Sequence, residues 1–151
     1  MTAAPGRAAG AGERPSASTL LGYWLPAVAY VGLIFSLSSI RGTDIPSGFP
    51  NMDKLAHLLE YSLLGLLLGR AIRFTMAGRG RVAASFATVL AGALVGMADE
   101  LYQRGVPGRS SDIRDWMVDV LAVSASVVFT QWVSTRSLRG RGVASTGEEP
   151  R

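Results

Sequence analysis

Four apolar stretches of similar length follow one another along the chain. They cover residues 20–37, 52–72, 82–101 and 116–133. A helix needs about 20 mostly apolar residues, at about 1.5 Å rise per residue, to cross the hydrocarbon core of a bilayer. Each stretch is close to that length, and the first contains no charged residue. We therefore predict an all-α polytopic membrane protein with four transmembrane helices in an antiparallel bundle.

The two ends of the chain are rich in small and polar residues, which bury too little apolar surface to fold. We expect a disordered tail over residues 1–19, a four-helix membrane domain over residues 20–135, and a second disordered tail over residues 136–151. The first apolar stretch also resembles a signal peptide, but it is longer than the usual apolar core of one. An uncleaved first helix is the favoured interpretation.

The distribution of positive charge predicts the orientation in the membrane. The chain has a net charge of +4, but its arginines stand beside apolar stretches in short loops, so we expect no nucleic-acid partner. Most Lys and Arg residues lie in the two tails and in residues 70–81, and fewer lie in the connections 38–52 and 103–114. The positive-inside rule then places both termini in the cytoplasm and those two connections outside the plasma membrane.

Ionisable residues interrupt the second apolar stretch near its start. Asp53, His57, Glu60 and Tyr61 fall at offsets 0, 4, 7 and 8, which is one face of a helix. His57 and Glu60 are neighbours at i and i+3 and can share a proton or a hydrogen bond. Two interpretations stay open, because such a pair can also be a satisfied polar contact that holds membrane helices together.

The third apolar stretch ends in Asp99, Glu100 and Gln103. Adjacent carboxylates repel each other in a low-dielectric region, so one of them can hold a proton near neutral pH. A carboxyl group that holds a proton in this way suits general acid or base chemistry. The alternative is a structural ion pair in which Arg104 or Arg109 neutralises them.

At the start of the fourth stretch, Asp112, Asp115 and Asp119 recur on one helical face. Acids in a first turn suit the helix dipole, but Asp119 is too deep for that explanation. In the predicted topology, all three polar sets converge in the outer third of the bilayer. Charged groups inside membrane segments usually face a bundle interior, so we predict one shared polar pocket beneath the outer surface.

Small residues predict where the helices come close together. Gly92 and Gly96, and likewise Gly65 and Gly69, are separated by three residues. This spacing lets two membrane helices approach each other closely.

Several of these motifs together resemble the VanZ-like family. The resemblance covers residues 20–133 and is carried by Asp53-Lys54-Leu55-Ala56-His57 with Tyr61, Asp99-Glu100 with Gln103, Pro107-Gly108-Arg109, Asp112 and Asp115-Trp116. It implies a small polytopic membrane protein, and the namesake of the family is linked to low-level resistance to the glycopeptide teicoplanin. The family pattern usually has Asn where this chain has Asp119, so this chain carries an additional acid in the cluster.

Two classes of function follow. In the first, the pocket binds a cell-envelope lipid, a lipid-linked peptidoglycan precursor or a glycopeptide antibiotic. In the second, the protein is an intramembrane enzyme: His57 acts as acid or base, Glu60 orients it, and Asp99 or Glu100 is the second acid.

In the enzyme hypothesis Arg109 holds a phosphate group. In both hypotheses the binding site is completed by Asp53, Tyr61, Gln103, Asp112, Asp115 and Asp119. The chain has no cysteine, which excludes a thiolate nucleophile and cysteine-bound zinc. A divalent metal such as Mg²⁺ or Mn²⁺ on the oxygen-rich cluster stays open, as does the oligomeric state. A transporter is disfavoured because the cytoplasmic half lacks polar groups.

Overall fold

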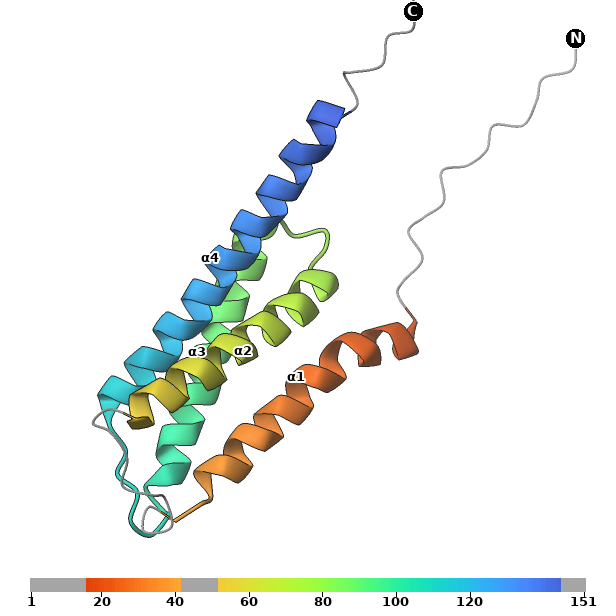
Figure 1. Ribbon diagram of the computed structural model, residues 1–151. Coiled ribbons are helices and arrows are strands. Elements are labelled where there is room, and N and C mark those ends of the chain that lie inside the picture. The colour runs from red at the N-terminus through yellow and green to blue at the C-terminus, as the bar shows by residue number, and fades with distance from the viewer. Residues whose placement is uncertain (1–15, 42–51, 145–151) are drawn as a thin grey trace, which may run out of the picture.

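Residues 16–41 and 52–144 are described by a computed structural model, with side chains up to residue 136. They form four α-helices, drawn in Figure 1 as α1 (Ala17–Ser38), α2 (Met52–Thr75), α3 (Arg81–Gln103) and α4 (Ile113–Ala144). In these ranges every regular element is a helix, and each helix contains a segment long and apolar enough to cross a membrane. This confirms the predicted all-α membrane fold.

Hydrogen bonds between helix ends show that the bundle is antiparallel. Ser39, directly after α1, bonds through its hydroxyl to that of Tyr102 near the end of α3, at 2.8 Å. At the opposite end, the indole N–H of Trp24 in α1 donates to the hydroxyl of Thr75, the last residue of α2, at 3.0 Å. The C-termini of α1 and α3 therefore meet the N-termini of α2 and α4 at one end of the bundle, as Figure 1 shows.

Charge separates the two ends of this bundle. We call one end the acidic end, because all acidic residues of the described ranges lie in that half: Asp53, Glu60, Asp99, Glu100, Asp112, Asp115 and Asp119. The other is the basic end, where the ionisable residues with described side chains are Arg70, Arg73, Arg79, Arg81 and Arg136, together with Tyr23 of α1.

The helices extend beyond the apolar stretches that predicted them. The largest difference is in α4, which continues to Ala144 and projects past the connection between α2 and α3 in Figure 1. Residues 136–144, expected to be disordered, are therefore helical. The prediction used only apolar residues and therefore ended where the sequence becomes polar. Polar residues can still continue the backbone hydrogen bonds of a helix that packing has already started. The predicted tails over residues 1–15 and 145–151 lie outside the described residues.

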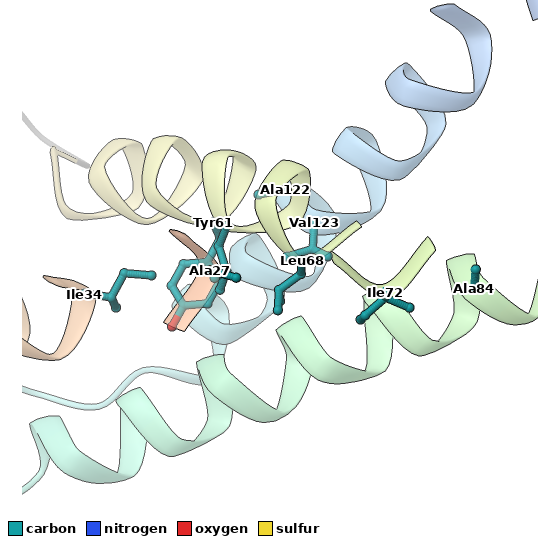
Figure 2. Close-up of a cluster of buried hydrophobic side chains, with 9 residues drawn as sticks. Ala27, Ile34, Tyr61, Leu68, Ile72, Ala84, Ala122 and Val123 are labelled. Atoms are coloured by element: carbon teal, nitrogen blue, oxygen red, sulfur yellow. The ribbon is translucent and has the colours of Figure 1, made fainter. Parts of the chain in front are cut away.

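The buried core lies between the helices, and apolar side chains also cover the outside. Figure 2 shows the core cluster, in which Ile34 of α1, Tyr61 of α2 and Val123 of α4 are fully buried. On the outer surface, large residues such as Leu121 and Val128 are 65% and 66% exposed. A continuous apolar exterior of this kind suits contact with lipid acyl chains.

Glycines bring α4 into contact with α2 and α3. A Cβ atom added at Gly92 of α3 would lie 2.7 Å from Cγ2 of Val123, and one added at Gly65 of α2 would lie 2.9 Å from Cβ of Ser126. Both distances are too short for real atoms, so these positions need glycine. The close approach predicted from small-residue spacing is confirmed at these two positions. Among the described residues, α1 contacts α2 and α3 but not α4.

Candidate functional site

A cluster of buried polar side chains lies at the acidic end, between α2, α3 and α4. Its members are exposed by 6% or less: His57 of α2, Asp99, Glu100 and Gln103 of α3, and Asp115 and Asp119 of α4. The helices thus bring together side chains that are 62 residues apart in the chain, as in the pair His57–Asp119. The sequence prediction that three polar sets converge is matched by this arrangement.

The closest contact in the cluster joins His57 and Asp119. Nδ1 of His57 lies 2.9 Å from Oδ1 of Asp119, and the ring of Tyr61 lies nearly parallel to the imidazole, with the ring centroids 6.1 Å apart. When Asp119 is ionised it can only accept a hydrogen bond, so Nδ1 of His57 then donates and Nε2 remains for another partner. The sequence had favoured Glu60 as the neighbour of His57. Among the described residues, the hydrogen-bond partner is instead Asp119.

A glycine makes room for Asp119. A Cβ atom added at Gly96 of α3 would lie 2.8 Å from Oδ2 and 3.2 Å from Cβ of Asp119. The carboxylate therefore lies directly against the backbone of α3, one turn before Glu100. Any larger residue at position 96 would displace it.

Asp99 and Gln103 connect α3 to α1. Nε2 of Gln103 donates to Oδ2 of Asp99 at 3.0 Å and to the hydroxyl of Ser38 at 3.4 Å. Both α3 residues were predicted on one helical face, and the structure places them there. Their hydrogen bond fixes the Asp99 side chain while leaving its other oxygen free for a different partner.

Glu100 holds the connection between α3 and α4. Its Oε2 accepts the backbone N–H of Asp112 at 2.9 Å. Asp112 in turn accepts the backbone N–H of Arg114 through Oδ1 at 2.9 Å, at the start of α4. Asp112 therefore lies at the edge of the cluster, where its side chain caps the N-terminus of α4. Glu100 belongs to the buried part of the cluster.

Lys54 is the principal cation of the cluster, and sequence reasoning missed it. Its Nζ lies 2.7 Å from Oδ1 of Asp115, 3.5 Å from Asp53 and 3.9 Å from Asp112. Asp115 is buried, so this ion pair offsets the cost of removing its charge from water. The available signal was that Lys54 is the only lysine in a chain that otherwise uses arginine.

Arg109 does not neutralise the carboxylates of α3. Its Nε donates to the carbonyl oxygen of Ile40 at 3.2 Å, and its Nη2 donates to that of Leu37 at 3.5 Å. The guanidinium therefore caps the C-terminus of α1, where the helix dipole favours a cation. Among the described residues, neither Arg104 nor Arg109 forms an ion pair with Asp99 or Glu100.

A small pocket opens beside His57. Its volume is about 50 Å³, which is room for a few water-sized groups. Glu60, which bonds to no part of the His57 ring in the described structure, lines this pocket together with His57 itself. The complete lining is Leu37, Ser38, Asp53, Ala56, His57, Glu60, Gln103 and Arg109.

Three buried polar atoms at this end have no hydrogen-bond partner among the described residues. They are the hydroxyl of Tyr61, Oδ1 of Asp99 and Oδ2 of Asp119. Buried carboxylate oxygens without a donor are costly, and they are usually satisfied by water, a proton or a cation. These three atoms can therefore interact with a water molecule, a proton or a cation.

A divalent cation fits this requirement. One ligand atom from each of His57, Glu100 and Asp119 lies within 4.8 Å of the other two. Two carboxylates and an imidazole form an acceptable donor set for Mn²⁺, and the free Oδ2 of Asp119 adds a suitable oxygen. The residues present thus fit a metal, which would contribute charge stabilisation when bound.

Comparison with known proteins gave one result. A family model described as VanZ/LLP1 matches residues 14–134, a range that contains the four membrane segments up to residue 134 and every candidate site residue. No curated protein and no solved structure matches the chain.

Proposed function

This chain belongs to the VanZ/LLP1 family, and on that premise we propose that it is a membrane enzyme acting on an outer-leaflet lipid or lipid-linked envelope precursor. The observation that carries the proposal is the buried His57–Asp119 pair beside an open pocket. A carboxylate on Nδ1 fixes the imidazole and stabilises its protonated form, which leaves Nε2 to accept or donate a proton.

The other site residues take roles that agree with their positions. Glu100 is buried within reach of the same cluster and is the second acid. Arg109 lines the pocket and offers N–H groups that suit a substrate phosphate. If a metal is bound, His57, Glu100 and Asp119 would hold it, and His57 would then act as a ligand rather than as the acid or base.

The size of the pocket limits what enters it. A volume of about 50 Å³ admits one polar group of a headgroup and excludes a whole glycopeptide. A link to teicoplanin resistance, as the family resemblance suggests, would then arise from an altered envelope component rather than from an enclosed antibiotic.

The test compares a deletion strain rescued with wild type, with His57→Ala, or with Arg79→Gln as a control exposed at the basic end. Lipid extracts are analysed by mass spectrometry at matched membrane expression. We expect a lipid or precursor species that depends on wild type and Arg79→Gln and falls about 10²- to 10⁴-fold with His57→Ala. Identical extracts from the deletion strain and the wild-type rescue would refute the enzyme proposal.

Binding without catalysis is the second candidate. The observation that favours it is that the pocket lining contains negatively charged groups, the carboxylates of Asp53 and Glu60, as well as a positively charged one, the guanidinium of Arg109. A binding protein would change teicoplanin susceptibility without producing any new lipid species. It would also lose its effect gradually through substitutions at Glu60, Gln103 and Arg109, whereas an enzyme loses it abruptly at His57.

The proposal requires the acidic end to face outward, with both termini in the cytoplasm. Because the chain has no cysteine, single cysteines can report the topology. Ser110→Cys, in the connection between α3 and α4, is expected to react with an impermeant maleimide on intact cells. Gly78→Cys, in the connection between α2 and α3, is expected to react only after permeabilisation. The reverse pattern would overturn the orientation.

A further inference from the structure

A second polar pocket lies at the basic end, away from the site described above. Its volume is about 110 Å³, and its lining is formed by Arg73, Arg81, Ser85, Gln131 and Ser134. These residues come from the end of α2, the start of α3 and the outer part of α4. Three helices thus contribute only cationic and neutral polar side chains to one cavity.

No acidic residue of the described chain is near enough to neutralise this pocket. All of them lie in the acidic half of the bundle, and none of the ion pairs in the described residues includes Arg73 or Arg81. Other arginines at this end have partners of a different kind. Arg70 stacks on the ring of Tyr23 at 4.5 Å, and Arg136 stacks on Trp132 at 3.9 Å.

The pocket lining also includes neutral hydrogen-bonding side chains. Nε2 of Gln131 donates to the hydroxyl oxygen of Ser85 at 2.6 Å, and the Ser85 hydroxyl can still donate to a further acceptor. The first turn of α3 adds free backbone N–H groups, because its N-cap residue is Gly80, which has no side chain to cap them. Guanidinium, hydroxyl and helix N-terminus are all groups that bind phosphate.

The depth of the pocket indicates where such a phosphate comes from. Arg73 is two residues before the end of α2, and Arg81 is the first residue of α3. The pocket therefore lies at the end of two membrane-length helices, which is the level of the lipid headgroups. Basic pockets between membrane helices at this level suit anionic lipid headgroups.

We propose that Arg73, Arg81, Ser85, Gln131 and Ser134 form a binding site for a phosphate group, carried by an anionic phospholipid or free in solution. This site is separate from the His57 cluster, and the proposal does not depend on the proposed function. The position at headgroup level favours the phospholipid as the source.

The test measures the midpoint of thermal unfolding of the full chain in a neutral detergent. Dioctanoyl phosphatidylglycerol, dioctanoyl phosphatidylcholine and inorganic phosphate are added separately at equal concentrations. A ligand that binds only the folded protein raises this midpoint. We expect phosphatidylglycerol to raise it by a few degrees and phosphatidylcholine to raise it less, since the choline cation opposes the arginines. An equal rise with inorganic phosphate would assign free phosphate as the ligand.

Double variants inside and outside the pocket distinguish binding in the pocket from attraction of the lipid by surface charge. Arg73→Gln/Arg81→Gln is expected to lose the rise, whereas Arg70→Gln/Arg79→Gln removes the same charge outside the pocket and is expected to keep it. Arg73→Lys/Arg81→Lys preserves charge and topology, and we expect a reduced rise because lysine cannot chelate a phosphate through two parallel N–H groups.

No rise with any additive in the wild type would overturn the proposal. So would equal loss in both glutamine pairs, or an undiminished rise in the lysine pair, because either result would mean that charge alone attracts the lipid.

Discussion

At the acidic end, charged side chains are drawn into the bundle and bond to one another, whereas at the basic end they lie on its surface or around an open pocket. His57 and Asp119 are buried and 2.9 Å apart, while Arg79 and Arg81 are exposed. Buried charges are retained only where packing and partners compensate for lost hydration. The comparison teaches that charged side chains form part of the buried structure at the acidic end, whereas the described arginines of the basic end lie outside the buried core.

The largest expected effect on stability comes from removing the charge of Lys54 at the acidic end. Lys54→Ala leaves the buried carboxylate of Asp115 without its ion-pair partner at 2.7 Å. Breaking a fully buried pair costs about 3–5 kcal/mol. Because the Lys54 side chain is 30% exposed, we expect a loss of about 2 kcal/mol in the free energy of unfolding, measured in detergent by chemical denaturation.

Lys54→Arg is the matched control, since it keeps the charge next to Asp115. It is expected to recover most of the loss. If Lys54→Ala unfolds at the same denaturant concentration as wild type, the acidic end does not depend on this ion pair, and the contrast between the two ends is wrong.

A smaller effect is expected from the close approach of α3 and α4. Gly96→Ala places a Cβ 2.8 Å from Oδ2 of Asp119. Overpacking usually costs about 1–3 kcal/mol, and alanine regains up to about 1 kcal/mol of helix propensity. We therefore expect a net loss of about 1 kcal/mol, together with lower activity because Asp119 is displaced from His57.

The control for this change is Gly22→Ala in α1, where an added Cβ meets no atom within 4 Å. Its stability should equal or slightly exceed that of wild type. Equal behaviour of the two alanine variants would show that Asp119 is not held against α3.

The smallest effect is expected at the basic end. Arg79→Gln removes an exposed charge that lines no described pocket, and surface substitutions of this kind change stability by about 0.5 kcal/mol or less. Denaturant midpoints of Arg79→Gln and wild type should therefore coincide within error. A loss comparable to that of Lys54→Ala would contradict the conclusion that the exposed charges of the basic end contribute little to stability.

The apolar stretches were sufficient to predict the four helices and to place Asp53, Glu100 and Asp119 at one end of the bundle. They could not predict which carboxylate bonds to His57. The neighbour at i+3, Glu60, follows from helix geometry alone, but the actual partner depends on how far α4 approaches and how it is rotated. Those quantities are fixed by Gly65, Gly92 and their contacts with Val123 and Ser126.

Two further features lay beyond sequence reasoning. Lys54 was not predicted as a site residue, because its partner Asp115 lies 61 residues away in the chain and on another helix. Arg109 was expected near carboxylates or phosphate, and two of its five donors instead bond to the carbonyl oxygens at the end of α1. Backbone acceptors have no signature in the sequence, so this partner could be found only in three dimensions.

The His57 pocket is lined by α1, α2, α3 and Arg109, and by no described residue of α4. Leu37 and Ser38 of α1 form one wall, and the described polar contacts that hold this wall come from Tyr102, Gln103 and Arg109 alone. Leu37 and Ser38 are the last two residues of α1, so this wall lies at the same level as the lipid headgroups. A displacement of α1 would therefore widen the pocket at the level where a headgroup lies, and the imidazole could be reached from the side of the bundle.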